Sequence, residues 1–252
     1  MPELPEVEVR RIAMERNFKE KRLQHINIVK KGIIKHNGSE KDFLEKSLDR
    51  IDRRGKYLIF KFSGNKTFVL HFGLFGEMAI ADSTRGLSSI CAEFGFNTGK
   101  NLYIFKWASI WFNKQIEELA VLGYDPVAEK DRFTLTYLKD SLLKKKTKMK
   151  RFLMDQSIIA GIGSVYADEI LFKAGVLPMR DTGSLKKDES ERLYQMIVKV
   201  LEDAIKKTVA YGREDRRFLS LENRVDCPVC STGIVKIRFA GRRTVYCPVC
   251  QH

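Results

Sequence analysis

Four cysteines near the end of the chain restrict its folding more than any other feature. Cys227 and Cys230 form one Cys-x-x-Cys pair, and Cys247 and Cys250 form a second. Each pair can place two thiolates on one side of a tight turn, and two such pairs complete the tetrahedral ligand set of a zinc ion. Disulfides are the alternative, but they are rare in proteins that stay inside the cell. We therefore expect these side chains to hold one structural zinc ion.

The segment between the two cysteine pairs has the pattern of a β-hairpin. β-Branched and aromatic residues recur through 234–246 on both sides of Ala240-Gly241, which predicts two strands joined at that turn. We expect a zinc-ribbon finger over residues 221–252. Four cysteine ligands leave no open coordination position, so the metal would support the fold and would not activate water.

The charge of the chain suggests a polyanionic partner. Its 252 residues include 46 Lys and Arg against 32 Asp and Glu, a formal net charge of +14. Nucleic acid is the leading candidate, although a generally basic soluble protein would also show this balance. The first residues are acidic, unlike a signal peptide, and no apolar run reaches the ~18 residues of a transmembrane helix. We expect an intracellular protein without membrane contact, in the cytoplasm or nucleoid, or in the nucleus of a eukaryote.

The second residue is a proline followed by a glutamate. If Met1 is removed, Pro2 carries a secondary α-amine with a reference pKa of about 7.7–8.0, against about 10.4 for lysine. Such an amine is partly unprotonated near neutral pH and can act as a nucleophile. Attack on a sugar C1′ would give an iminium ion, and Glu3 could transfer protons beside it. A turn-prone, frayed terminus is the alternative.

The apolar pattern changes near the middle of the chain. The first part contains strand-like runs and two expected helices, at 7–17 and 39–49, so we predict an α+β chain that begins with a β-sandwich domain over 1–125. The expected strands are 23–29, 57–62, 67–72 and 102–105. A linker over 126–131 and a helical domain over 132–220 follow, with helices expected from 134, at 149–154 and 165–173, and within 185–209. We expect the lysine run 144–150 to be a solvated face or a phosphate contact.

A glycine-rich turn lies within the helical part. Gly161 and Gly163 precede a helical pattern, and backbone amides at a helix N-terminus can bind phosphate, although a plain turn between helices is the usual meaning. Together with Pro2-Glu3-Leu4-Pro5-Glu6 and the zinc ribbon, this turn resembles the helix-two-turn-helix element of the formamidopyrimidine-DNA glycosylase / endonuclease VIII (Fpg/Nei) family. The resemblance to this family covers essentially the whole chain, which looks like a divergent member. It includes residues 53–58 and 122–126.

The resemblance implies a base excision repair enzyme. The family acts on damaged double-stranded DNA as a DNA glycosylase and as a lyase of abasic sites, by β,δ-elimination. Pro2 matches its Schiff-base nucleophile, Glu3 its general acid/base and Glu6 a second acid near the site. Expected substrates are oxidised or ring-opened bases and abasic sites, and a monomer is expected.

The resemblance also implies a set of DNA contacts. Lys56 and His71 match residues that bind the DNA backbone, and Arg242 matches an arginine that clamps phosphates and aids the second elimination, so that Lys56 and Arg242 also count as catalytic. Further DNA contacts are expected from the glycine turn and from apolar side chains able to wedge between bases. These are Gly163, Ser164, Tyr166, Leu74, Phe75 and Ile110.

The sequence departs from the family pattern in three places. Ser164 stands where the family usually has Asn, and residues 106–111 lack the two arginines of the family's Arg-Arg-Phe loop. The connection 211–226 is short and charged, which disfavours a deep cap over 8-oxoguanine; Arg213, Arg216 and Arg217 within it are either DNA contacts or part of a solvated basic loop. These departures leave open a damage-binding protein of the same fold with little base excision. A zinc-ribbon transcription or RNA factor would explain the cysteines but not the N-terminus.

Overall fold

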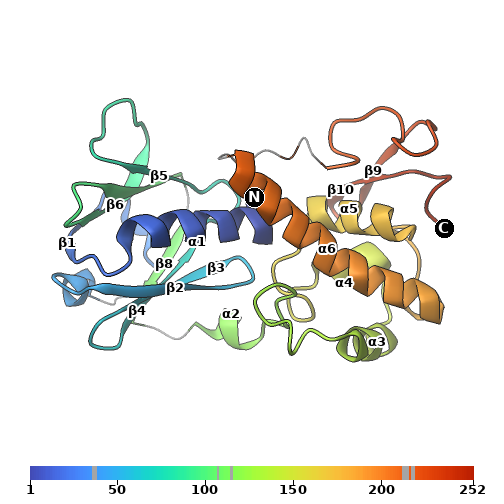
Figure 1. Cartoon of the computed structure of the whole chain (residues 1–252), viewed down its shortest axis with the longest axis horizontal. Coiled ribbons are helices and arrows are strands. Elements are labelled where there is room, and N and C mark those ends of the chain that lie inside the picture. The colour runs from blue at the N-terminus through green and yellow to red at the C-terminus, as the bar shows by residue number, and fades with distance from the viewer. Residues whose placement is uncertain (36–38, 107, 114–115, 212–215, 217–218) are drawn as a thin grey trace. The chain divides into compact units, whose positions relative to one another are not determined.

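The computed structural model describes residues 1–35, 39–106, 108–113, 116–211, 216 and 219–252 (Figure 1). These residues form two units. The first consists of Met1–Pro2 and Glu6–Ala120, and the second of Glu3–Pro5 and Val121–His252. The expected division after residue 125 lies close to the observed boundary between residues 120 and 121. Residues 3–5, in contrast, belong to the second unit although their neighbours in sequence belong to the first.

The first unit contains one long helix and two antiparallel sheets, as expected for an α+β fold. Helix α1 spans Leu4–Phe18. One sheet has the strand order β1-β6-β7-β5 and the other β2-β3-β4-β8. Their bounds are β1 Leu23–Ile28, β6 Ile90–Phe96, β7 Asn101–Phe105, β5 Glu77–Ala81, β2 Leu48–Arg54, β3 Tyr57–Phe62, β4 Lys66–His71 and β8 Ser109–Phe112. The short helix α2, Glu117–Ala120, ends the unit.

Aromatic side chains from both sheets pack together in the core of the first unit. Strand β3 alternates between half-buried and buried residues, so Leu58, Phe60 and Phe62 face inward. Phe68 stacks on Phe60 with ring centroids 4.2 Å apart, and on Phe94 of the other sheet at 5.2 Å. Full burial of one such side chain contributes about 1.5–3 kcal/mol.

The prediction of a helix over 39–49 is wrong. Residues Glu40–Phe43 form only a 3₁₀ turn, η2, and strand β2 already begins at Leu48. Glu45 has a φ of 58°, which no residue inside an α-helix adopts. The ring of Phe43 packs against Phe62, at 5.5 Å between centroids, so tertiary packing outweighs the local helical pattern. A second 3₁₀ turn, η1, spans Lys31–Ile33.

Helices and the zinc-finger hairpin form the second unit, and the expected helices are confirmed. Their bounds are α3 Leu135–Lys144, α4 Met149–Met154, α5 Ser164–Ala174, the 3₁₀ turn η3 Thr182–Ser184 and α6 Lys187–Tyr211. The hairpin consists of β9 Val235–Phe239 and β10 Arg242–Tyr246, with Phe239 paired to Arg242 across the turn. Thr134 caps α3 by accepting a hydrogen bond from the Tyr137 amide.

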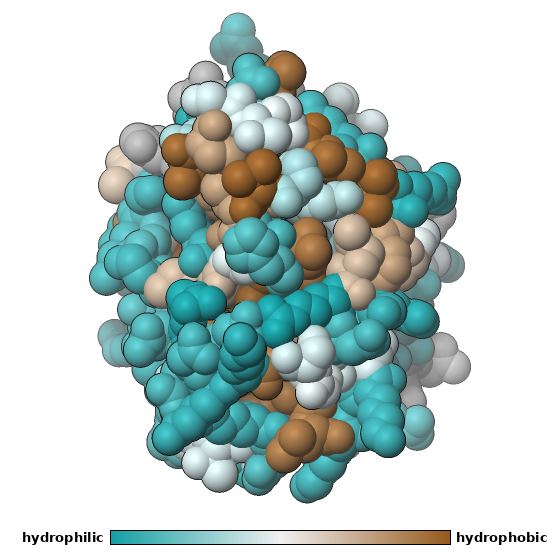
Figure 2. Space-filling model, turned by 90° about the vertical axis from the view of Figure 1, so that its right-hand side faces the viewer, coloured by the Kyte–Doolittle hydropathy of each residue, from teal (hydrophilic) through white to brown (hydrophobic). Residues whose placement is uncertain are grey.

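The core of the second unit is mostly aliphatic. Helix α6 contributes a stripe of buried residues at helical spacing, Leu193, Ile197 and Leu201, which pack in one cluster with Leu138 of α3 and Ile170 of α5. Among the described residues, no helix is long and apolar enough to cross a membrane. On the face drawn in Figure 2, hydrophobic residues lie in separate groups among hydrophilic ones.

Candidate functional site

The carboxylate of Glu3 lies against the start of helix α5. One oxygen accepts hydrogen bonds from the amides of Gly163 at 2.7 Å and Tyr166 at 3.3 Å, and the other accepts from Val165 at 3.0 Å. The positive end of the helix dipole and its unpaired N–H groups stabilise a negative charge at this position. Glu3 is only 3% exposed, so its carboxylate is fixed and largely screened from water.

The two glycines of the turn permit this arrangement. A Cβ atom on Gly163 would lie 2.3 Å from the Glu3 carboxyl carbon, closer than any real contact. Gly161 has a φ of +100°, and its carbonyl accepts the Leu4 amide at 3.0 Å. The two glycines therefore make the space and supply the backbone groups that residues 3 and 4 contact. This corrects the expectation that the Gly163 amide binds a DNA phosphate, because Glu3 occupies that amide.

Pro2 and Glu6, the other expected catalytic residues near the N-terminus, lie in the first unit. Pro2 is half-buried, and Glu6 is 3% exposed. The same unit holds the two expected backbone contacts, Lys56 and His71. Lys56, in the turn between β2 and β3, is 7% exposed.

His71 ends strand β4 and is neutral at physiological pH. The pKa of His71 is lowered to about 4, mainly by burial and also by the nearby positive charge of Lys56, while Glu118 acts in the opposite direction. Its Nδ1 accepts the Gly73 amide at 3.2 Å, so the ring proton is on Nε2 and can be donated. The ring of Tyr57 lies 4.6 Å from the His71 ring.

A tight turn over residues 72–76 exposes two large apolar side chains. Leu74 is 53% exposed and Phe75 is 66% exposed. The Gly76 amide donates to the Phe72 carbonyl at 2.7 Å, and a Cβ on Gly76 would lie 2.1 Å from that oxygen. Arg10 holds the turn from α1, because its guanidinium lies over the Phe72 ring at 4.2 Å and donates to the Gly76 carbonyl at 3.0 Å.

Two other expected DNA contacts are buried. Ile110 is 0% exposed and pairs with Leu70 inside the second sheet, so it is a core residue and cannot wedge between bases. Tyr166 is also 0% exposed, in the core of the helical unit, with the Arg216 guanidinium 5.6 Å from its ring centre. Trp107, Arg213 and Arg217 lie outside the described residues.

The four cysteines come together as expected. The Sγ atoms of Cys227, Cys230, Cys247 and Cys250 all lie within 4.8 Å of one another, and two of the pairs are 3.5 and 3.7 Å apart. Zn–S bonds of ≈ 2.3 Å in a tetrahedron put the sulfur atoms about 3.8 Å apart, so the cluster has the size that zinc requires. The Val229 amide donates to the Cys227 sulfur and the Cys250 amide to the Cys247 sulfur, each at 3.4 Å, which stabilises the thiolates and fixes their orientation.

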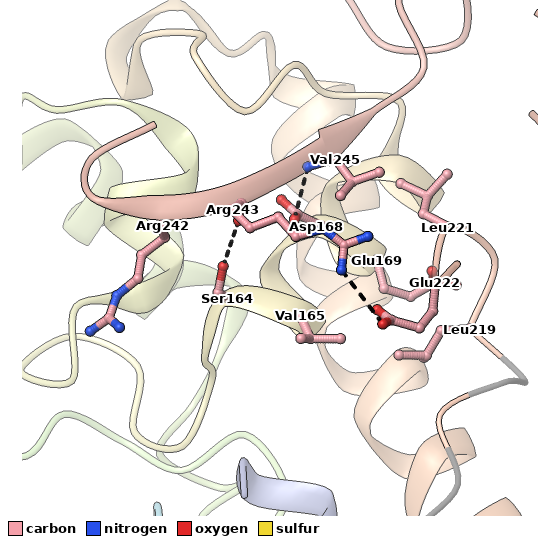
Figure 3. Close-up of a pocket in the computed structure, with 10 residues that line it drawn as sticks. All are labelled: Ser164, Val165, Asp168, Glu169, Leu219, Leu221, Glu222, Arg242, Arg243 and Val245. Carbon is pink, nitrogen blue, oxygen red and sulfur yellow. Dashed lines mark hydrogen bonds and ion pairs between the residues drawn. The ribbon is translucent and has the colours of Figure 1, made fainter. Parts of the chain in front are cut away.

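Arg242 opens strand β10 of the finger and is exposed. Its side chain points away from the other labelled residues in Figure 3, while Arg243 extends toward Glu222, with which it forms an ion pair of 3.7 Å. Apolar side chains such as Leu219 and Leu221 and charged ones such as Arg243 line a pocket of about 190 Å³ beside β10. The amide of Ser220 donates to buried Glu169 at 2.8 Å, which fixes this side of the pocket.

Sequence reasoning missed a buried ion pair beneath β10. Lys150 belongs to the lysine run expected to be a solvated face or a phosphate contact, but it is 1% exposed and contacts Asp168 of α5 at 2.8 Å. A lysine run gives no sign that one member is buried, although its position on the apolar side of the 149–154 helix could have suggested it. Lys150 is therefore not part of a solvated face.

Comparisons with known proteins identify families that match most of the chain. Residues 1–105 match the family model of the formamidopyrimidine-DNA glycosylase N-terminal domain, 122–213 that of the formamidopyrimidine-DNA glycosylase H2TH domain, and 227–252 that of the zinc finger found in FPG and IleRS. The zinc-finger match and the sulfur cluster together assign one structural zinc ion to the chain.

Relatives and solved structures match along the full length. The formamidopyrimidine-DNA glycosylase of Desulfitobacterium hafniense is 33% identical over 275 residues, and that of Carboxydothermus hydrogenoformans is 32% identical over 278, each covering 100% of both chains. The Lactococcus lactis FPG (MutM) protein in complex with FAPY-dG-containing DNA has a TM-score of 0.88 and 27% identity over 99% of both chains. Since sequence and fold agree from end to end, the chain belongs to the formamidopyrimidine-DNA glycosylase family.

Proposed function

We propose that this chain is a base excision repair enzyme that removes damaged bases and cleaves abasic sites through the amine of Pro2. The observation that carries the proposal is the position of the Glu3 carboxylate at the start of helix α5. Three backbone amides hold a buried carboxylate next to Pro2 in sequence, and a structural role alone does not require the charge to lie beside a potential nucleophile.

The chemistry follows from these residue types. The Pro2 nitrogen attacks C1′ of the damaged nucleoside, the bond from C1′ to the base breaks, and the sugar ring opens to an iminium ion. The iminium accepts the electron pair left when the 2′ proton departs, which expels the 3′ phosphate. A second elimination expels the 5′ phosphate, and the product leaves when water hydrolyses the iminium. We assign proton transfer at the opening sugar to Glu3 and a supporting role to Glu6.

DNA binding is assigned to exposed or donating groups in both units. Lys56 and the Nε2–H of His71 suit phosphate oxygens, and Arg242 suits phosphates because it is exposed on a finger stabilised by zinc. The turn with Leu74 and Phe75 suits a gap left by an extruded base. We propose a monomer that acts on double-stranded DNA in the cytoplasm or nucleoid.

The substrate proposal draws on the relatives. Two Lactococcus lactis structures hold FAPY-dG-containing DNA and DNA with an abasic site. We propose ring-opened or oxidised bases and abasic sites as the substrate class for this chain. A panel of duplexes with one lesion each and varied opposite base would rank the lesions by single-turnover rate.

A trapping experiment tests the mechanism. The protein is incubated with an abasic duplex and borohydride, and the adduct is located by mass spectrometry, which also shows whether Met1 has been removed. We expect one adduct, on Pro2, its loss in Pro2→Gly, and a rate at least about 100-fold lower in Glu3→Gln with unchanged duplex binding. Tight binding of abasic DNA without an adduct would identify a damage-binding protein instead, and normal nicking by Pro2→Gly would refute the mechanism.

A further inference from the structure

Two functional elements of the second unit meet at one buried contact. Helix α5 begins at Ser164 and holds Glu3 at its first amides, and strand β10 begins at Arg242. Between them lies a set of polar contacts that we call the α5–β10 junction: the side chains of Ser164, Lys150 and Asp168 with residues 243–245 of β10. Figure 3 shows the bonds that Ser164 and Asp168 make to this strand.

Lys150 supplies the centre of the junction from helix α4. Its ammonium group donates to the Asp168 carboxylate at 2.9 Å, to the Thr244 hydroxyl at 2.9 Å and to the Arg243 carbonyl at 2.6 Å. These bonds engage all three donors of an ammonium group. Lys150 therefore connects α4, α5 and β10 through one buried atom.

Asp168 and Ser164 attach β10 directly to α5. Asp168 accepts the Val245 amide at 3.0 Å, which is a backbone bond that β9 does not supply. The Ser164 hydroxyl donates to the Arg243 carbonyl at 2.9 Å, so this one oxygen accepts bonds from both Ser164 and Lys150. A serine hydroxyl has a single proton, and here that proton is directed at the finger and not at a phosphate.

We propose that Ser164, Lys150 and Asp168 are positioning residues that fix β10 against α5 and thereby set the position of Arg242 relative to Glu3. The inference rests on the proposed function and extends it, because it gives Ser164 a role other than DNA contact. The junction acts through Arg242, at the far end of the same strand segment, and needs no contact of its own with DNA.

The electrostatics of the junction agree with this role. Burial raises the pKa of Asp168 to about 6, while Lys150 and the Val245 amide favour its ionised form. Burial also lowers the pKa of Lys150, and the charge of Asp168 opposes that effect. Each charge therefore needs its partner, so the pair fixes one arrangement of the three elements.

Amide hydrogen exchange tests the junction independently of activity. The full-length zinc-loaded protein is compared with Ser164→Ala and Lys150→Met, following a peptide that covers residues 242–246. We expect exchange in this peptide at least about tenfold faster in both variants, with zinc content unchanged, because the bonds to β10 are lost. Ser157→Ala and Lys199→Met are matched controls, since Ser157 bonds to Asp155 and Lys199 forms an exposed pair with Asp203.

Reaction products separate positioning from phosphate contact. On an abasic duplex we expect Ser164→Ala to slow the second elimination about tenfold relative to the first, with an unchanged dissociation constant, and Ser164→Thr to restore the ratio because it keeps the hydroxyl. Normal exchange in Ser164→Ala overturns the proposal, and so does weaker binding with a shallower salt dependence, which would mark a phosphate contact. An inactive wild-type protein with the expected exchange pattern would refute the enzyme but not the junction.

Discussion

At the scale of single residues, the site depends on which negatively charged group binds the backbone amides at the start of helix α5. A helix N-terminus that faced DNA could bind a phosphate, and the Gly-x-Gly pattern alone favours that interpretation. In this protein the chain supplies its own anion, Glu3, and uses three of the amides. The sequence shows that glycine is present but not which group approaches it, because that group lies about 160 residues away.

The neutral state of His71 has a measurable consequence for stability. Its pKa is about 4 in the native protein, while the ordinary value of 6.5 applies when the chain is unfolded. Between these values the unfolded state binds the proton and the native state does not, so the free energy of unfolding falls as the pH is lowered from about 6.5 to about 4.

We expect His71→Gln to show a shallower loss of stability in this pH window. Urea unfolding at a series of pH values measures it, and His25→Gln, which changes an exposed histidine paired with Glu93, is the control. Equal slopes in the wild-type protein and in His71→Gln would show that His71 titrates normally.

At the scale of elements, we expect changes in the turn over 72–76 to affect excision from duplex DNA without affecting the stability of the fold. Its apolar side chains are exposed, so Leu74→Ala and Phe75→Ala should change the free energy of unfolding by no more than about 0.5 kcal/mol. We expect the double variant to excise a damaged base from duplex DNA at least about tenfold more slowly, because an apolar wedge stabilises the gap left by extrusion.

Single-turnover excision measures this effect, and Leu143→Ala is the control because Leu143 is 72% exposed on α3. The Leu74 and Phe75 double variant should lose much less activity on a single-stranded abasic substrate, because a single strand has no base-pair stacking for the wedge to replace. An equal loss on both substrates would assign the turn to chemistry or general binding.

Elements whose pattern is local were predictable from the sequence, and elements that depend on distant partners were not. The stripe of α6 and the hairpin around Ala240-Gly241 are visible within a few turns or strand residues, and both were confirmed. The 39–49 helix failed because Phe43 packs into the sheet core. Ile110 and Lys150 were misplaced for the same reason, since their strand partner Leu70 and ion-pair partner Asp168 come from other segments.

At the scale of the whole molecule, we expect zinc to link folding of the finger to DNA binding. The cysteine cluster joins both ends of the hairpin that carries Arg242, and a small cross-linked element of this kind loses its order without metal. We expect chelation to reduce affinity for abasic duplex DNA at least about tenfold, while the helices and the sheets remain folded.

Metal analysis, circular dichroism and DNA titration of the same samples measure these effects. Cys247→Ser should reproduce the chelated state, whereas Cys91→Ala, which removes a buried thiol outside the cluster, should keep one zinc ion per chain. Full DNA affinity in the metal-free protein would contradict a role for the finger in binding.

The membership of residues 3–5 in the second unit determines the order in which the site is completed during synthesis. The ribosome makes Pro2 and Glu3 first, but the amides that receive Glu3 belong to residues 163–166 and emerge much later. A nascent chain that ends within the first unit therefore contains the Pro2 amine but lacks the amides that bind the Glu3 carboxylate. If Pro2 and Glu3 act as proposed, the site becomes complete only after translation has passed residue 166 of the 252-residue chain.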